Sequence, residues 1–461
     1  MRTIYREGMN TVMKSIKIGL IVALSIVTIS LCGILAYGMA GGDVFRRDRR
    51  QSYNNVQLVL EKEIPLEGID SISILYGMNS NDVYLLESEK DAITVREYSS
   101  SELSEKELST VKVDGNCAEI RGARRNDGRF GFFWFGNGGS YNRHYTEVYL
   151  PASYQGELLL ETSSGDIVSE LAVRSEKDVS ITSSSGDVEF SSMAAENVSV
   201  NTSSGYVKVE DIHAGTDSST GEINIGTSSG DVDVKELTGR TDIECSSGNV
   251  TAKTITGDAQ LKTSSGDINI EELTGEAKTE CSSGYLSIGT LTGNAQFKTT
   301  SGDVEVQYAD GDVQTSTSSG SVKISEGSGD RRISTTSGSI MAGSTEGSFQ
   351  VSTQSGDVQI TVQKGDGSIE TTSGDIRLSL EELAGALNIN SSSGYVSVTL
   401  SEENEFELEV STTSGDIGTF FDNDLTFSSR RNHAQGIHGG NGGNNHIEIQ
   451  TTSGDVRISK Y

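Results

Sequence analysis

The sequence has 461 residues, of which 34% are hydrophobic and 6% aromatic, with 53 glycines, 2 prolines, 4 cysteines and a formal net charge of −30. This composition argues against the large irregular core from which most enzyme pockets are formed, and the few prolines without glycine at every third residue argue against collagen and proline-rich linkers. A chain this acidic is not expected to bind nucleic acid.

The first predicted element is a transmembrane helix at residues 18–40, IGLIVALSIVTISLCGILAYGMA, which carries no charge and is long enough to span a bilayer. It would follow a cytoplasmic segment at 1–17 and precede a juxtamembrane linker at 41–55. Basic residues before and after the helix are nearly balanced, so charge alone does not set its orientation. A cleaved signal peptide is the alternative, although the apolar run is longer than is usual for one.

Residues 56–150 contain strand-like runs such as VQLVLEKEI, DSISILYG and EVYLP, but no repeated motif. We interpret them as divergent coils that cap a repeat array, since terminal repeats must differ from internal ones. An aromatic and glycine-rich loop at 124–145, RRNDGRFGFFWFGNGGSYNRHY, interrupts this region.

Residues 151–461 are dominated by an internal repeat. A Ser/Thr-Ser/Thr-Gly motif, which reads Gln-Ser-Gly at Gly356, recurs in fifteen units, and from Gly230 to Gly374 each motif glycine follows the last by 18 residues. A second glycine lies midway between motifs, at 239, 257, 275, 293, 311, 329, 347 and 365. Each unit therefore has two turns and two straight segments.

The repeat columns predict strands. The second residue after every motif glycine is Ile, Val or Leu, and the fourth is apolar in thirteen of fifteen units. Alternation with a period of two indicates short strands with one buried face, and such strands need neighbouring units to cover that face. The sequence thus predicts an all-β fold, a two-sheet parallel β-solenoid with 18-residue coils, roughly 70 Å long at about 4.8 Å per coil.

We attribute glycine at both corners to its free access to positive φ. An antiparallel sandwich is the alternative fold, but it gives no reason for constant spacing. A Gly-, Asn- and His-rich insertion at 420–445 precedes the final coil and is expected to be a loop at one edge. Its two histidines, together with His446 at its border, match no metal-ligand spacing.

The residue after the motif glycine is Asp in nine of the fifteen coils. Aspartate favours turns and keeps sheet ends soluble, which is the structural explanation. Calcium binding is the alternative, because stacked coils would align these carboxylates and nine-residue half-units resemble calcium rolls, although the calcium-roll signature is absent. The calcium candidates are Asp231, Asp267, Asp303, Asp357 and Asp375.

Three residues before the motif glycine the column is mostly threonine, with Cys245 and Cys281 replacing it in two coils. These cysteines lie two coils apart, roughly 9.6 Å by strand spacing, which exceeds the disulfide limit of about 7 Å. We predict that both are free and buried. Because the threonines of this column are expected to face the core as well, they are not expected to form an exposed ice-binding face.

An aromatic cluster within 124–145 offers one candidate contact surface. Either it folds over the open end of the solenoid as a cap, or it contacts a partner or the membrane surface. The candidate contact residues are Phe130, Phe132, Phe133, Trp134 and Phe135. We find no catalytic motif and predict no catalytic residue and no cofactor, apart from the calcium alternative; scattered basic residues also argue against a polysaccharide-cleaving β-helix enzyme.

The N-terminal span, the EVYLP lead-in, the repeated (S/T)SGD-(V/I)-x-(V/I) units and the final TTSGDVRI coil together resemble the bacterial putative-adhesin family, a domain of unknown function. The resemblance covers about residues 56–461. It implies a single-pass cell-membrane protein of the cell envelope whose C-terminal body is extracellular, and it supplies no catalytic residue.

We therefore expect a membrane-anchored, surface-exposed, non-enzymatic β-solenoid, an adhesin or an envelope-stress-associated binding or structural protein. Its expected partners are the membrane, through the helix, and cell-wall or envelope components. The alternative is a calcium-binding adhesion or sensory module that uses the Asp column. The sequence sets neither the handedness of the solenoid nor an oligomeric state.

Overall fold

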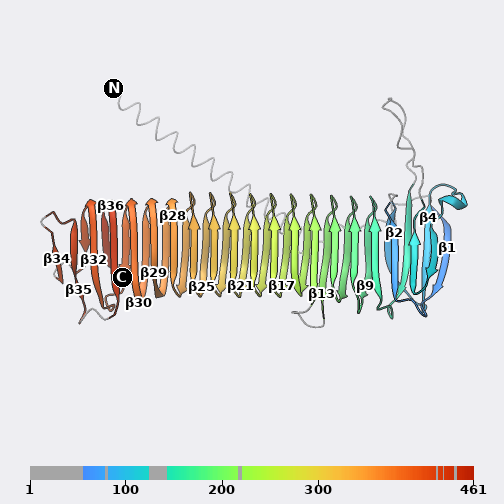
Figure 1. Cartoon of the computed structure of the whole chain (residues 1–461), viewed down its shortest axis with the longest axis horizontal. Helices are drawn as coiled ribbons and strands as arrows, with labels where there is room; N and C mark the ends of the chain where they lie inside the picture. The colour runs from blue at the N-terminus through green and yellow to red at the C-terminus, as the bar shows by residue number, and fades with distance from the viewer. Residues whose placement is uncertain are drawn as a thin grey trace, which may run out of the picture. The chain divides into compact units, whose positions relative to one another are not determined.

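The computed structural model describes residues 56–77, 81–123, 143–215, 221–421, 424–428, 430–440 and 444–461. Taken by itself, the unit formed by residues 57–461 is an elongated stack of β-strands (Figure 1). The predicted helix at 18–40, with its flanks at 1–17 and 41–55, lies outside the described residues. Among the residues that are described, no helix is long and apolar enough to cross a bilayer.

The strands form two series of neighbours, which we call ladder A and ladder B. In spatial order, ladder A consists of β5 (Thr110–Asp114), β6 (Cys117–Arg121), β2 (Ser71–Tyr76), β8 (Glu157–Thr162), β10 (Val179–Ser183), β12 (Val198–Thr202), β14 (Glu222–Thr227), β16 (Arg240–Cys245), β18 (Ala259–Thr263), β20 (Ala277–Cys281), β22 (Ala295–Thr299), β24 (Val313–Thr317), β26 (Arg331–Thr335), β28 (Phe349–Ser355), the later parts of β29 (Val358–Ser373) and β30 (Ile376–Ser393), β36 (His446–Ser453), β32 (Phe406–Ser414), β35 (His433–His438) and β34 (Leu425–Phe427).

Ladder B carries the other half of each coil. In spatial order it consists of β1 (Gln57–Pro65), β4 (Ala92–Ser99), β7 (His144–Pro151), β3 (Asp82–Ser88), β9 (Ile167–Arg174), β11 (Val188–Ala195), β13 (Val207–Ala214), β15 (Val232–Thr238), β17 (Val250–Thr256), β19 (Ile268–Thr274), β21 (Leu286–Thr292), β23 (Val304–Asp310), β25 (Val322–Ser328), β27 (Ile340–Glu346), the first parts of β29 and β30, β31 (Val396–Leu400), β37 (Val456–Lys460) and β33 (Ile417–Thr419). A short 3₁₀ helix, η2 (Glu105–Glu107), lies between β4 and β5.

The register of the central coils confirms the predicted parallel stacking. In ladder A, Ala259 pairs with Thr241 on one side and with Ala277 on the other, and each partner is 18 residues away. Ladder B has the same offset, as in the pairing of Val250 with Ile268. The fold is thus all-β and solenoid-like, with mostly parallel strands.

The two ladders are not separate sheets, which corrects one part of the sequence prediction. All 37 strands of the described residues belong to one hydrogen-bonded sheet. The connection is made by β29 and β30, which run through the corner without a break: Lys364 pairs with Glu382, and Gly367 pairs with Leu387 beyond the bend. The sheet therefore curves around the core at this coil.

The core is a single narrow layer between the two ladders. Alternate residues of each strand point inward, as the burial pattern of β18 and β19 shows. Ile243, Leu261, Phe297 and Ile369 occupy the same inward column of ladder A and are completely buried. One continuous hydrophobic cluster runs from Ile64 to Ile458, so every coil contributes to the same core.

The two glycine columns have different physical causes, which corrects the common explanation given above. Glycines midway between motifs do adopt positive φ, for example 137° at Gly275. The motif glycine Gly248 does not, yet a Cβ added there would lie 1.9 Å from the carbonyl oxygen of Gly230 in the preceding coil. Most motif glycines are thus required by the close approach of successive backbones.

At the N-terminal end, spatial order departs from chain order. The coil formed by β2 and β3 lies between the coil of β6 and β7 and that of β8 and β9. Three antiparallel pairings, β1–β4, β4–β7 and β5–β6, complete this end. The segment predicted as divergent coils therefore combines coils with antiparallel strands.

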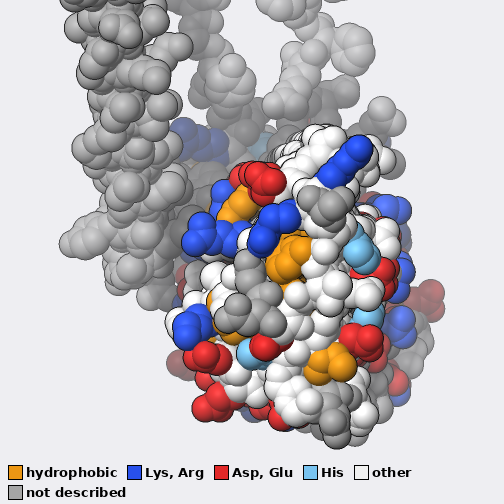
Figure 2. All heavy atoms as spheres, turned by 90° about the vertical axis from the view of Figure 1, so that its left-hand side faces the viewer, with side chains coloured by type: hydrophobic (Ala, Val, Ile, Leu, Met, Phe, Trp, Pro, Cys, Tyr) orange, Lys and Arg blue, Asp and Glu red, His pale blue; other side chains and the backbone are white. Residues whose placement is uncertain are grey.

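The C-terminal end has a similar inversion. The final coil, β36 and β37, lies between the coil of β30 and β31 and the coil of β32 and β33 that precedes it in the chain. Part of the insertion predicted as a loop forms β34 and β35, and β35 pairs antiparallel with β32. Figure 2 shows this end, where charged and histidine side chains surround a few separate apolar ones, a composition that discourages edge-to-edge pairing.

Candidate functional site

The Asp column at the motif corner is held by the backbone of the neighbouring coil. The Oδ1 atom of Asp303 accepts a hydrogen bond from the amide N–H of Ser321 at 2.7 Å. The other calcium candidates make the same bond with the next coil: Asp231, Asp267, Asp357 and Asp375 accept from Asn249, Tyr285, Asp375 and Tyr395 at 2.8, 2.8, 2.9 and 3.0 Å.

This bond needs an oxygen but no charge. Asn249 occupies the same position in its own coil, and its Oδ1 accepts the amide N–H of Asp267 at 2.9 Å. Within the described part of the chain, no three His, Cys, Asp or Glu side chains are grouped closely enough to hold a metal ion. The geometry therefore accounts for the column as a chain of turn-stabilising hydrogen bonds.

The predicted aromatic contact residues, Phe130, Phe132, Phe133, Trp134 and Phe135, lie outside the described residues. The histidines of the 420–445 insertion and its border are described, and they do not converge. The ring of His438 lies 4.8 Å from that of Phe421, and His446 Nδ1 is 3.8 Å from a carboxylate oxygen of Glu407.

The residues three positions before the motif glycine point into the core, as predicted. The Thr263 hydroxyl oxygen accepts the amide N–H of Gly266 at 3.0 Å, and the Cys245 and Cys281 sulfurs accept those of Gly248 and Gly284 at 3.1 Å. Both cysteines are free and buried, as predicted. Burial raises the pKa of each thiol, so both are held as thiols at neutral pH.

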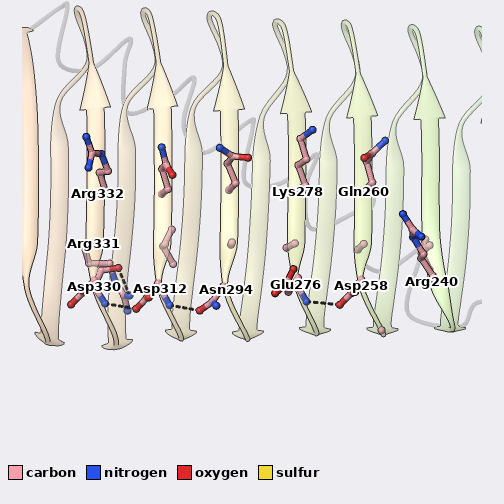
Figure 3. A pocket seen from close by; sticks show the side chains of 18 of the residues that line it. Arg240, Asp258, Gln260, Glu276, Lys278, Asn294, Asp312, Asp330, Arg331 and Arg332 are labelled. Atoms are coloured by element: carbon pink, nitrogen blue, oxygen red, sulfur yellow. Dashed lines mark hydrogen bonds between the residues drawn. The ribbon is translucent and has the colours of Figure 1, made fainter. Parts of the chain in front are cut away.

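A second column of polar residues follows the midway glycines, and the sequence analysis did not single it out. Asn294 Oδ1 accepts the N–H of Asp312 at 3.0 Å, Asp312 Oδ1 that of Asp330 at 2.9 Å, and Asp330 Oδ1 that of Ser348 at 2.9 Å. Figure 3 shows Asn294, Asp312 and Asp330 aligned along one corner. The signal was present in the sequence, because most residues that follow the midway glycines are polar or charged.

Next to this column, an open groove of about 1160 Å³ crosses the outer face of ladder A from β16 to β28. Gln260 and Lys278 project from the neighbouring strands β18 and β20 along it, and Arg332 projects from β26 (Figure 3). The lining also includes the side chains of Asp242, Gln296, Gln314 and Gln350.

The end of the groove at β16 carries an acidic group in an altered environment. Burial raises the pKa of the Asp242 carboxyl, and the neighbouring Glu244 carboxylate raises it further. Gln260 Nε2 donates a long hydrogen bond of 3.4 Å to Asp242 Oδ2. On the same face, Lys262 and Glu244 form an exposed ion pair at 3.2 Å.

A second groove, of about 490 Å³, continues over ladder A from β28 to β36 and β32. One of its lining residues, Glu370, is ionisable. The others are hydroxyl and amide residues: Ser352, Thr353, Gln354, Thr371, Thr372, Asn390, Ser391, Ser392, Ser411, Thr413, Gln450, Thr451 and Thr452. Such a surface is suited to hydrogen bonding with a molecule laid along it rather than to proton transfer.

The first groove is underlain by a buried cation. Arg331 is 2% exposed and occupies the inward position that Val313 and Phe349 fill in the adjacent coils. Its guanidinium donates to the carbonyl oxygens of Gly311, Ala309 and Ser328 at 2.7, 2.9 and 2.8 Å. Burial lowers its pKa, and nearby aspartates oppose that shift.

A family model described as Toastrack DUF4097 matches residues 69–290, 253–360 and 294–459. No curated protein matches the chain. The resemblance inferred from the repeat motif is thus confirmed at the level of the family.

Three solved structures are similar to parts of the chain. A "putative cell adhesion protein" from Clostridium sporogenes is 8% identical over 88% of this chain and 100% of its own, with a TM-score of 0.14. A "putative lipid binding protein" and a "putative adhesin" from Parabacteroides distasonis are 14% and 12% identical, over 72% and 87% of this chain and 98% and 97% of their own, with TM-scores of 0.15 and 0.14. These TM-scores are too low to carry an argument about function.

Proposed function

The chain belongs to the Toastrack DUF4097 family, and from that premise we propose that it is a membrane-anchored, non-enzymatic rod of the bacterial cell envelope that binds or spaces envelope components. The proposal includes a membrane anchor at residues 18–40, an extracellular body and a role in adhesion or in an envelope-stress response.

One observation carries the proposal. The rod presents outward side chains at equivalent positions of its coils, as Gln260, Lys278 and Arg332 do along ladder A (Figure 3). Repetition at about 4.8 Å per coil lets many weak contacts act together on one extended partner. Enzymes instead bring a few catalytic groups together in one enclosed pocket.

The charge distribution supports an envelope role for the body. The chain has 66 acidic and 36 basic residues, while the first 50 residues are net basic. An acidic body would be kept away from anionic lipid by electrostatic repulsion and would extend from the membrane surface. A basic segment close to the apolar span would be attracted to that surface.

Two measurements test the proposal. Protease added to intact cells should cleave the body at 57–461 if it is extracellular, and leave it intact if it is not. The purified full chain should then be retained by isolated cell-wall fractions, alongside a variant that lacks 124–145. Equal retention of the two forms would place the binding surface on the solenoid, whereas loss in the deletion variant would assign it to the aromatic loop. No retention of either form would refute a binding role.

A further inference from the structure

The outer face of ladder A from β22 to β36 has few charges, although the chain as a whole has a net charge of −30. Its outward positions are mostly amides and hydroxyls: Gln296, Gln314, Ser316, Ser334, Gln350, Ser352, Ser368, Asn388, Asn390 and Gln450. Lys298, Arg332, Glu370 and Glu448 are the charged exceptions at these strand positions. The second groove lies on this face, whereas the first begins at β16 and is also lined by charged residues, among them Arg240, Asp242, Asp258, Glu276, Lys278, Asp312 and Asp330.

Ladder B differs over the same coils. Its outward positions include many charged residues: Glu305, Lys323, Glu326, Lys364, Arg377, Glu381 and Glu382. Several of them form ion pairs between coils, such as Lys323 with Glu305 at 2.7 Å and Lys364 with Glu382. Over these coils, the low charge is therefore a property of the ladder A face and not of the repeat.

We propose that the outward amide and hydroxyl residues of ladder A, from β22 to β36, bind an extended, uncharged, hydroxyl-rich polysaccharide. This inference rests on the proposed binding function and names the class of ligand. Glutamine and asparagine amides both donate and accept hydrogen bonds, as do serine and threonine hydroxyls, so they match sugar hydroxyls without requiring a charge on the partner.

Charge and apolar content separate this ligand from other partners. A polyanion would be repelled by the net charge of −30. Protein interfaces usually centre on large apolar or aromatic anchors, and the large exposed hydrophobic residues among those described lie outside both grooves: Leu58, Val113, Tyr308, Met341, Ile437 and Tyr461.

The shallow, extended shape of this surface suits a polymer better than a small sugar. Both grooves are open, and together they cross the coils from β16 to β32. Each coil can offer only a few hydrogen bonds to the ligand. Each of them replaces a hydrogen bond to water and therefore contributes little free energy. Affinity must therefore come from many coils that contact successive units of one chain.

The experiment measures migration of the purified full chain, kept in mild detergent, through native gels that contain dextran, mannan or the polyanion alginate. The test variant is Gln314→Glu with Gln350→Glu, which adds charge at two exposed positions of ladder A with little change in shape. The matched control is Gln307→Glu with Gln359→Glu, at exposed positions of ladder B.

We expect dextran or mannan, but not alginate, to retard the wild type and the ladder B variant, and the ladder A variant to bind about tenfold more weakly. Unaltered melting temperatures would show that all forms are folded. Unretarded migration of the wild type in both neutral gels, stronger retardation by alginate, or equal behaviour of the two variants would overturn the proposal. Retention of the wild type by cell-wall fractions with no retardation by neutral gels would refute only the ligand class, whereas loss of both would refute the binding function too.

Discussion

Arg331 fills the space in the core that Gly327 leaves empty. Gly327 occupies the inward position taken by Leu291 and Ala309 in the two preceding coils, and its register partner is Ala309. The Arg331 guanidinium donates to the carbonyls of that Ala309 and of Ser328, the residue after Gly327. The arginine side chain thus reaches across the corner to the place of the missing apolar side chain.

The same exchange of volume runs through the neighbouring coils. A large residue before the midway glycine accompanies a small one after it, as in Leu273 with Ala277 and Leu291 with Ala295, all of which are buried. At the corner around Gly329 the sizes are reversed, because the small residue Gly327 comes before the midway glycine and the large residue Arg331 comes after it. Interiors are close-packed, so the summed volume at a corner must be kept nearly constant even when single positions change.

We predict that Arg331→Ala lowers the free energy of unfolding by about 2–4 kcal/mol, because it opens a cavity and removes the donors to several buried carbonyls. Arg331→Met should cost less, since it keeps an apolar stem in the cavity. Urea unfolding measures both. Arg332→Ala is the matched control at the adjacent exposed position and should change stability by less than about 0.5 kcal/mol. A loss no larger in Arg331→Ala than in Arg332→Ala would contradict the packing role.

The Asp column gives a second prediction. Asp303→Ala should destabilise the chain by about 0.5–1 kcal/mol, because the amide of Ser321 loses its acceptor. Asp303→Asn should be nearly neutral, since Asn249 makes the equivalent bond. Thermal melting with excess calcium and with EDTA separates this role from metal binding. A calcium-dependent rise in melting temperature that is lost in both variants would favour the calcium alternative instead.

The buried cysteines give a third prediction. Since burial raises the pKa of Cys245 and Cys281, their thiolate fractions at pH 8 are smaller than those of exposed thiols. Iodoacetamide should leave both unmodified in the native chain and modify both in urea. Peptide mass mapping reads out the result, and the half-buried Cys117 is the internal reference, expected to react first. Rapid native labelling of Cys245 or Cys281 would show that the core around them opens.

The inverted order at the C-terminal end gives a fourth prediction. Truncation after Asn445 removes β36 and β37, which lie inside the stack, so β32 and β35 should lose their attachment although they remain in the chain. Hydrogen exchange should become fast in Phe406–Ser414 and His433–His438 and stay slow in the central coils. Retained protection of β32 would mean that it pairs directly with β30 once the final coil is gone.

The repeat by itself determined the central part of this protein. Constant 18-residue spacing and strict alternation set the coil, its parallel register and the buried columns, because each unit can cover its apolar face only with an equivalent unit above and below. The burial and free state of Cys245 and Cys281 followed from the same spacing. The family followed from the motif and its arrangement along the chain.

Only the tertiary structure decided the order of the ends, the union of the two ladders and the role of Arg331. Stretches such as 89–116 and 420–445 lie outside the repeat spacing, so which edge a terminal coil pairs with depends on hydrogen bonds and packing that no local pattern encodes. Arg331 bonds to Gly311 and Ala309 of the preceding coil as well as to Ser328 nearby, and the low-charge face of ladder A is formed by residues that lie 18 or more apart in the sequence. Local sequence fixes which side of a strand is buried, whereas contacts between coils fix what that side meets.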